Sequence, residues 1–399
     1  MSGPAPLELT VLRSPDDLAA CRDAWDACVA ATGGDIYFTA DWILTWWRHF
    51  GQRRRFLAIR VGDQRGLVAV LAFAVETFGP APFGLRIARL AGMDHNFAIL
   101  GLPLRSDRAV EAMGAVFARL TGEEHCNGIS LSPISDVAEG LAATRAAAQD
   151  QGLSVVVDNT ARGHTVLRLP TTFEAYWGGL SKSRQKEYRR SKTKMEQRYQ
   201  LEYRASTLGS VEAMFANFVV LHAEQWRAAG KGGHFSDWAG SSRFYADIVK
   251  CLAPSGRAFI EEHLGNEQVL SSRLTFRFGQ RAYWRLTARS KDSEVLRLGV
   301  GRVSLVERVG LLIASGVDLV EAGAGEYDYK LNYGGELIAL RQIVLAAQGQ
   351  HRRIRLLLVW ADLLHLLYYR IWFLKLAPRL GRFGFRPRPL WQVWIRTRL

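Results

Sequence analysis

Apolar residues recur at helical and strand intervals through the first 150 residues. Leu18, Cys21, Trp25 and Cys28 are spaced three and four apart, which predicts an amphipathic helix. A second, aromatic helix is predicted over Phe38–Gly51, where the glycine ends it. The same half is predicted to contain a strand–turn–strand unit, two helices and two short strands: Phe56–Glu76, Arg108–Leu120, Val137–Gln151, Phe97–Leu100 and Gly128–Leu131.

The second half repeats this order of helices, a strand meander, a helix and a buried strand. The predicted elements are helices over Thr172–Tyr199, Val211–Ala229 and about Ser241–Cys251, three strands over Arg257–Ser290, a helix from Gly299 to about Ala314, and a strand over Val317–Gly323. The halves share a pattern rather than residues, so we interpret them as a weak internal duplication. Antiparallel strands with interspersed helices predict an α/β fold with α+β-type mixed sheets.

Length and composition divide the chain further. The 399 residues exceed one ordinary core, so we predict an N-terminal domain over 1–162, a C-terminal domain over 163–349 and a tail over 350–399. Hydrophobic content of 48% with 23% charged residues is typical of packed proteins. The start has neither basic residues nor an apolar run, and the four cysteines form no CxxC pair. We therefore expect a cytoplasmic protein without a metal.

The net charge of +14 is concentrated in two elements. Residues 181–198 hold eight Lys/Arg and two Glu, and residues 350–399 hold eleven Lys/Arg and one Asp, so the remainder is close to neutral. The first element is either a solvated helix face or a surface for polyanions, namely CoA phosphates, tRNA or lipid headgroups. DNA is not an expected partner.

The tail is predicted to be an amphipathic helix that Pro378 ends. One face would carry His351, Arg352, Arg355, Asp362, His365 and Arg370, and the other would carry Trp360, Leu364, Leu367, Tyr368, Ile371 and Leu374. Asp362 and Arg370 interrupt the apolar run, so a membrane-spanning helix is not expected. The pattern favours a helix in the membrane interface, on the cytoplasmic face of the inner membrane. Packing on the protein's own body or on a dimer partner is the alternative.

Several segments resemble one branch of the GNAT acyltransferase superfamily. They are FTADWILTWWRHFG, LRLPTTFEAYWGGLSKSRQKEYRRSKTKME, AYWRLTARS with the glycines near residue 300, and VDLVEAGAGEYDYKLNYGG. This branch comprises double-GNAT proteins of cellulose and exopolysaccharide gene clusters, and it is related in architecture to Fem-type aminoacyl transferases. The resemblance implies tandem GNAT-like domains, with the chemistry between about Gly163 and Gly335. Leu298-Gly299 departs from the family's usual Pro-Gly, and Glu321 stands where Asp is usual.

The glycine-rich start at Arg297–Gly310 is the candidate donor site. A helix N-terminus presents unpaired N–H groups to a phosphate. Gly299 and Gly301 would allow close approach, and Arg302 adds positive charge. The resemblance implies that CoA pyrophosphate binds at this turn. The alternative is an ordinary glycine-rich helix start.

Candidate catalytic residues follow in the next segment. Glu321 ends a predicted buried strand, so burial could raise its pKa towards that of a general base. Tyr329 could donate a proton to the departing thiolate, and Lys330 could contact phosphate or orient substrate. The alternatives are a Glu321–arginine ion pair and a solvated loop charge at Lys330.

Three further residues are also candidates. His222 lies on a predicted helix, four residues before Trp226, where a structural role is the alternative. Asp94 and His95 precede a strand, and the pair could deprotonate an amine held between the halves, unless they only cap a turn. No HExxH, Walker or GxSxG sequence is present, so these hydrolase classes have no support.

Together these features predict an acyl-CoA-dependent N-acyltransferase. Its acceptor would be a membrane-associated amine: a sphingoid-type lipid amine, as in bacterial ceramide-forming acyltransferases, or a lipid-linked precursor of envelope polysaccharide. Two alternatives remain open. The donor would be aminoacyl-tRNA in a Fem-like enzyme, or the chain would be a GNAT-like binding module without catalysis.

Overall fold

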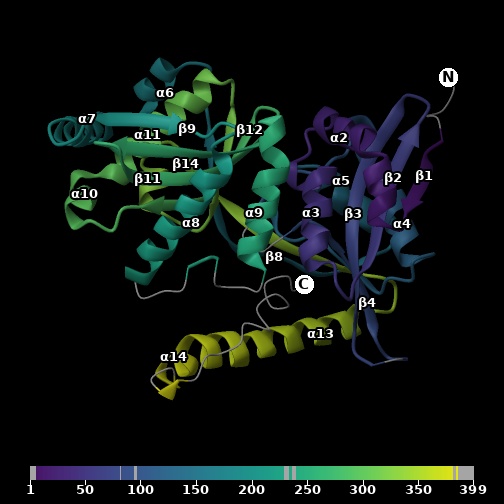
Figure 1. The fold of residues 1–399 in the computed structure, drawn as a ribbon. Helices are drawn as coiled ribbons and strands as arrows, with labels where there is room; N and C mark the ends of the chain where they lie inside the picture. The colour runs from purple at the N-terminus through teal and green to yellow at the C-terminus, as the bar shows by residue number, and fades with distance from the viewer. Residues whose placement is uncertain are drawn as a thin grey trace. The chain divides into compact units, whose positions relative to one another are not determined.

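The computed structural model describes residues 6–80, 82–93, 97–228, 233–235, 240–380 and 383–384 (Figure 1). The chain forms two compact units. Unit 1 contains residues 1–161, 237–240 and 340–399, and unit 2 contains residues 162–236 and 241–339. Both units combine helices with β-strands, so the predicted mixed α/β class is confirmed.

Unit 1 is built on a mixed sheet. The strands follow the spatial order β1 (Glu8–Leu12), β2 (Arg55–Asp63), β3 (Gly66–Phe78), β4 (Leu85–Leu90), β6 (Gly128–Ser130) and β14 (Gly335–Ala346). Neighbouring strands are antiparallel except for the parallel pair β4–β6. The helices of this unit include α1 (Pro15–Ala20), α2 (Arg22–Ala31), α3 (Ala40–Phe50), α4 (Ala109–Thr121) and α5 (Leu141–Asp150).

Two predictions in this unit need correction. Helix α3 begins at Ala40, because Ile36–Phe38 form a separate 3-10 turn. The helix predicted from Val137 begins only at Leu141, because Ile134–Glu139 form β7. Gly140, at φ 89°, separates this strand from α5. Left-handed backbone is easily reached only by glycine, so this residue marks the change from strand to helix.

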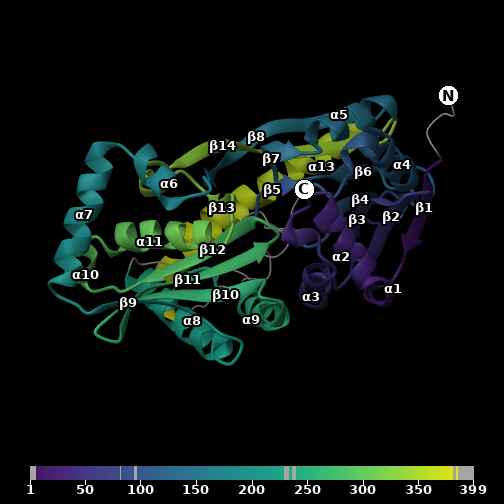
Figure 2. The same ribbon diagram turned by 90° about the horizontal axis from the view of Figure 1, so that it is seen from above.

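Unit 2 has its own ordered set of strands. From β8 (Ser154–Arg168) the order runs through β13 (Leu319–Ala324), β12 (Arg281–Arg289), β11 (Gln268–Phe278) and β10 (Ala258–Gly265) to β9 (Leu201–Ala205). Among the described strands of this unit, β12 and β13 are the one parallel pair. Helix α11 (Val300–Ala314) lies on one face, and α8 (Val211–Ala228) and α9 (Ser241–Leu252) lie on the other (Figure 2).

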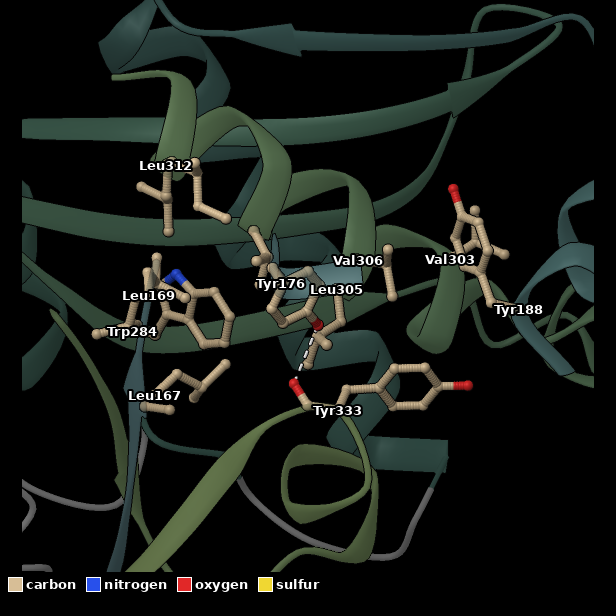
Figure 3. Close-up of a cluster of buried hydrophobic side chains, with 14 of the residues drawn as sticks. Leu167, Leu169, Tyr176, Tyr188, Trp284, Val303, Leu305, Val306, Leu312 and Tyr333 are labelled. Carbon is tan, nitrogen blue, oxygen red and sulfur yellow. Dashed lines mark hydrogen bonds between the residues drawn. The ribbon is translucent and has the colours of Figure 1, made fainter. Parts of the chain in front are cut away.

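A hydrophobic core lies beneath α11. Leu305, Val306 and Leu312 pack there with Leu167 of β8 and Trp284 of β12 (Figure 3). The Tyr176 hydroxyl of α6 (Phe173–Gly179) donates a 3.0 Å hydrogen bond to the Tyr333 carbonyl, so the core is tied to the segment that follows β13. Burying such side chains stabilises the unit by roughly 1.5–3 kcal/mol each.

The long helix predicted over Thr172–Tyr199 is two helices, α6 and α7 (Lys182–Glu196). Leu180 has extended backbone, and the Ser181 hydroxyl accepts a 3.3 Å hydrogen bond from the Arg184 N–H. An N-cap serine of this kind starts a new helix. Strands β8, β9 and β14 were not predicted.

The tail is helical, but not as predicted. Helix α13 (His351–Leu364) continues as the π-helical segment η4 (His365–Leu376) and then as α14 (Ala377–Leu380). The helix therefore does not end at Pro378, because proline is tolerated in the first turn of a helical segment. The wider turns of η4 also change which residues share a face beyond His365.

One face of α13 packs on the body of unit 1, beside β4 (Figure 1). Ile354 and Leu358 are buried with Leu85, Ile87 and Val344. This corresponds to the alternative in which the helix packs on the protein itself. Among the described residues, no helix has both the length and the apolar character needed to cross a bilayer.

Candidate active site

Strands β12 and β13 pair over only three residues. The last parallel pair joins Tyr283 to Glu321, and β12 continues to Arg289. β12 also carries a bulge, because Thr275 of β11 faces Trp284 while the preceding Leu274 faces Leu286. The bulged residue is Arg285. Bulges re-aim side chains and are frequent beside active sites.

Glu321 lies at this divergence and is fully buried. Its Oε2 accepts a 3.0 Å hydrogen bond from Arg285 Nη1, and its Oε1 accepts one of 2.8 Å from the Gly323 N–H. His164 Nδ1 lies 3.7 Å from Oε1. Burial acts to raise the pKa of Glu321, but His164, Arg285 and the Gly323 N–H outweigh it, so the pKa is lowered.

The expectation of a raised pKa at Glu321 is therefore wrong. The carboxylate stays ionised and forms the arginine pair that the sequence left as its alternative. Arg285 is itself 3% exposed at its side chain, so both charges depend on each other in a region with little water. This pair is suited to holding β12 and β13 in place where they separate.

Lys330 lies in the short helix α12 (Asp328–Leu331) and is 6% exposed. Its Nζ donates a hydrogen bond to the Ala322 carbonyl and lies 4.8 Å from the centre of the Tyr327 ring. Burial and the charge of Arg273 lower the pKa of Lys330 to about 8, although Glu321 acts in the opposite direction. The alternative of a solvated loop charge is wrong. An amine with this pKa is partly neutral near physiological pH.

Tyr329 neighbours this amine. Its ring centre lies 6.0 Å from Lys330 Nζ, and it contacts Tyr327. The residue as a whole is 41% exposed, and partial desolvation of its phenol raises the pKa of Tyr329 against the opposing effect of Arg273. The phenol is therefore protonated at neutral pH, which is the state that a proton donor needs.

The start of α11 is packed against α7. Gly299 has φ 88°, and a Cβ added to it would lie 2.8 Å from Ser191 Oγ. Arg302 donates 2.7 Å hydrogen bonds to Ser191 Oγ and to Glu187 Oε1. Both Gly299 and Arg302 thus have structural roles in this helix junction. Their predicted contact with phosphate stays a prediction.

Other basic residues lie around this turn. Arg297 is in the last turn of α10 (Ser293–Leu298), just before the left-handed Gly299. A Cβ on Gly301 would lie 3.6 Å from Nη1 of Arg289, which ends β12. The turn therefore combines a helix N-terminus with at least two further cations, an arrangement that favours an anion.

His222 lies elsewhere in unit 2, in an aromatic cluster. It is 1% exposed, and its ring lies near Phe218, Trp226 and Phe235. Its Nε2 is 3.2 Å from His234 Nδ1. Burial and His234 lower the pKa of His222 to about 3, so its ring is neutral and a weak base. Its surroundings are those of the structural alternative.

Asp94 and His95 lie outside the described residues, so their predicted role stays a prediction. The sequence also failed to single out His164, Arg273, Arg285 and Arg289. Arg273, Arg285 and Arg289 occur inside predicted strands, where charged residues are uncommon. Arginines inside predicted strands were therefore the signal from which these residues could have been found. Across the described residues, no three His, Cys, Asp or Glu side chains gather as metal ligands do.

Known proteins resemble this chain over the segment that contains Glu321 and Lys330. Residues 182–331 match the family described as acetyltransferase (GNAT) domain. A comparison with curated protein sequences found no match. The crystal structure of FemX is similar over 87% of this chain and 100% of its own, with a TM-score of 0.61 and 11% identity. This likeness shows a shared fold.

Two other solved structures are similar to a smaller degree. One is the C-terminal domain of a putative lysylphosphatidylglycerol synthetase from Agrobacterium fabrum, with a TM-score of 0.49, 11% identity, and coverage of 87% of this chain and 96% of that one. The other is a tandem GNAT protein from the clavulanic acid biosynthesis pathway, with a TM-score of 0.41, 14% identity, and coverage of 86% and 98%.

From the family match, residues 182–331 form a GNAT-type acetyltransferase domain, and this supports an acyltransferase activity.

Proposed function

We propose that this protein transfers an acyl group from acyl-CoA to an amine, with Lys330 as the general base. The observation that carries the proposal is the buried Lys330 amine, with a pKa of about 8, beside the divergence of β12 and β13. A general base works best when its pKa lies near the working pH. The family match of the surrounding residues supports the same reaction class.

The proposed reaction needs only the two reactants and the side chains of Lys330 and Tyr329. The acceptor nitrogen attacks the thioester carbonyl carbon, a C–N bond forms and the C–S bond breaks. Neutral Lys330 takes the proton that the nitrogen loses. The departing thiolate takes a proton from Lys330 in its ammonium form or from Tyr329, whose phenol is protonated at neutral pH; in the second case the Lys330 ammonium returns its proton to the Tyr329 phenolate. Amide and CoA thiol are the products.

Glu321 has a positioning role in this proposal. Its charge acts to raise the pKa of Lys330 and so moderates the effect of burial. Its ion pair with Arg285 joins the two strands at their divergence. The CoA phosphates would bind at the start of α11, near Gly301, Arg289 and Arg297, where positive charge and a helix N-terminus meet.

The exposed face of α13 supports a membrane-associated acceptor. Leu356, Val359, Trp360 and Leu363 recur three and four apart and are 40–69% exposed. They lie opposite the buried Ile354, Leu358 and Ala361, while exposed Arg352, Arg353 and Arg355 precede or flank them. Such a helix suits the interface of an anionic bilayer on the cytoplasmic face of the inner membrane. A lipid amine and a lipid-linked envelope sugar are the two acceptor classes.

A Fem-like reaction with aminoacyl-tRNA is the second candidate. The observation that favours it is a row of exposed cations on α7: Lys182, Lys186, Arg190 and Lys194. None of the four has an ion-pair partner within the described part of the chain. Such a row attracts any polyanion, CoA as well as RNA.

The deciding experiment uses the pure full-length protein. Acyl-CoAs of several lengths are incubated with a sphingoid amine or with an amino-sugar precursor, and thiol release and amide formation are measured. We expect release that depends on the acceptor and that Lys330→Met abolishes. Absence of thiol release with every pairing would overturn the proposal. Transfer from aminoacyl-tRNA instead would establish the second candidate, and CoA binding without turnover would indicate a binding module.

A further inference from the structure

Arg273 is a buried cation in the middle of β11. The residue is 3% exposed, and its guanidinium carbon lies 4.0 Å from the centre of the Trp284 ring. Within the described part of the chain, its Nε has no hydrogen-bond acceptor, and no carboxylate forms an ion pair with it. Burial and the nearby Arg308 lower the pKa of Arg273 to about 10, so it is charged at neutral pH.

The neighbouring buried arginine shows the usual arrangement. Arg308 of α11 donates a 3.0 Å hydrogen bond to the Tyr203 hydroxyl and one of 3.1 Å to the Glu261 carbonyl. The Glu261 carboxylate lies 4.0 Å from Arg308 and accepts hydrogen bonds from Tyr203 and Thr275. Glu261 is thus already engaged. A charge buried without such partners is strongly destabilising, so an uncompensated arginine calls for a ligand.

Other groups near Arg273 also favour a negatively charged ligand. The charge of Arg273 lowers the pKa of Lys330 and also acts to lower that of Tyr329, and the Tyr329 ring centre lies 6.0 Å from Lys330 Nζ. The nearby Glu321 is engaged with Arg285. Two cations and a phenol O–H therefore influence one another here, while the nearby carboxylates Glu261 and Glu321 already have partners. Each can donate hydrogen bonds, and an arginine fork can bind a carboxylate or phosphate through two of its nitrogens.

We infer that Arg273, stacked on Trp284 and flanked by Lys330 and Tyr329, is the binding site for an anionic group, a phosphate or carboxylate, of one of the two reactants. Identifying the bound molecule as a reactant rests on the proposed function. The anion replaces the missing counter-charge of Arg273 and places the rest of its molecule beside the Lys330 amine. An uncharged reactant analogue lacks this anchor.

The test measures binding, not transfer, so it is separate from the test of the proposed function. Full-length protein is titrated calorimetrically with inorganic phosphate, with acetate and with CoA, at constant ionic strength. The variants are Arg273→Met and the matched control Arg277→Met. Arg277 lies on the same strand but donates to the Ser315 carbonyl at the surface. We expect phosphate or acetate to bind the wild type and Arg277→Met saturably, and Arg273→Met to lose about tenfold or more in affinity.

Unfolding of the ligand-free variants supplies an independent readout. Arg273→Met removes an uncompensated charge, so its midpoint of thermal unfolding should equal or exceed that of the wild type. Should this variant not fold, Arg273→Lys keeps the charge but loses the two-nitrogen fork, and the same loss of affinity is expected.

The CoA titration distinguishes the two sources of the anion. Equal weakening of CoA and phosphate by Arg273→Met assigns the site to the donor, and loss of phosphate or acetate with unchanged CoA binding assigns it to the acceptor. The inference is overturned if no probe binds the wild type saturably, or if Arg273→Met binds as tightly as Arg277→Met.

Discussion

The proposed chemistry depends on the buried amine of Lys330. Lys330→Met removes the proposed base without adding a charge, and general-base catalysis typically contributes ~10²–10⁴-fold. We therefore expect a loss of that size in kcat/KM, measured as thiol release under steady-state conditions. In the wild type, kcat/KM should rise with pH and level off above about 8, because the neutral amine is the active form. A Lys330→Met enzyme with an unchanged rate and pH profile would exclude the base role.

The same residue makes a prediction about stability. The pKa of Lys330 is about 8 in the folded protein, below its ordinary value of 10.5. Between these values the unfolded chain binds more protons, so the stability of the folded protein rises with pH. At about 1.36 kcal/mol per pH unit, this penalty below pH 8 is on the order of 3 kcal/mol. Urea unfolding should show that any advantage of Lys330→Met at pH 7 shrinks by pH 10. An advantage that is independent of pH would contradict the lowered pKa.

The sequence identified Glu321, Tyr329 and Lys330 as one constellation, and the structure places Tyr329 beside Lys330 and couples Lys330 to Glu321. The sequence did not predict the ionisation states of these three residues. The pKa of Glu321 depends on Arg285 and His164, which reach it from β12 and β8. The burial of Lys330 depends on the way α12 returns to Ala322. These are tertiary contacts, and a local pattern contains no information about them.

At the scale of elements, the junction between α7 and α11 depends on Gly299. Gly299→Ala would place a Cβ 2.8 Å from Ser191 Oγ at φ 88°, which is strained for any residue with a side chain. We expect a loss of about 1–3 kcal/mol in the free energy of unfolding, measured by denaturant titration. Gly178→Ala is the matched control, because a Cβ there meets nothing within 4 Å. Equal stability of the two variants would show that α7 does not constrain this turn.

The exposed face of α13 predicts membrane binding that depends on particular side chains. A triple Leu356→Gln, Trp360→Gln, Leu363→Gln variant should lose most of its co-sedimentation with phosphatidylglycerol vesicles, because each apolar side chain that leaves the interface forfeits roughly 1.5–3 kcal/mol. Its unfolding should be unchanged, since these side chains are exposed. Leu208→Gln and Val220→Gln, at exposed positions in unit 2, are the controls. Undiminished sedimentation of the triple variant would remove the docking proposal.

Elements with a clear hydrophobic period were predictable, and those set by partners were not. The β2–β3 hairpin and α11 lie close to their predicted positions. Strand β8 was missed because its middle, DNTARG, is polar and becomes a strand only by pairing. The break between α6 and α7 was signalled by Ser181, a favourable N-cap, although helical composition on both sides concealed it.

At the scale of the whole chain, the connectivity was the least predictable feature. Residues 340–399 belong with the first 161 residues, so unit 2 is largely inserted between two parts of unit 1. Strands β8 and β14 each contribute residues to both units. A division read linearly along the chain cannot represent such an arrangement. The charge distribution, in contrast, was readable directly, with one basic element in each unit.

This separation of charge predicts separable functions. Replacing the exposed row Lys182, Lys186, Arg190 and Lys194 by Gln should raise KM for acyl-CoA at low salt and leave vesicle binding unchanged, because the row lies on unit 2 with the candidate donor site. Deleting residues 350–399 removes α13, whose Ile354 is buried in unit 1, so Arg352→Gln, Arg353→Gln and Arg355→Gln are the better matched change. They should weaken binding to anionic vesicles by about 1 kcal/mol per residue and leave KM unchanged.

Salt separates electrostatic attraction from direct contact in this experiment. The KM of the α7 variant should converge with that of the wild type as ionic strength rises, because exposed charges are screened over about 10 Å at 0.1 M salt. If the α7 variant instead loses RNA binding and keeps its KM for acyl-CoA, the row serves a tRNA-linked donor. If both variants lose both activities equally, the two basic elements act as one surface and the assignment of one task to each unit is wrong.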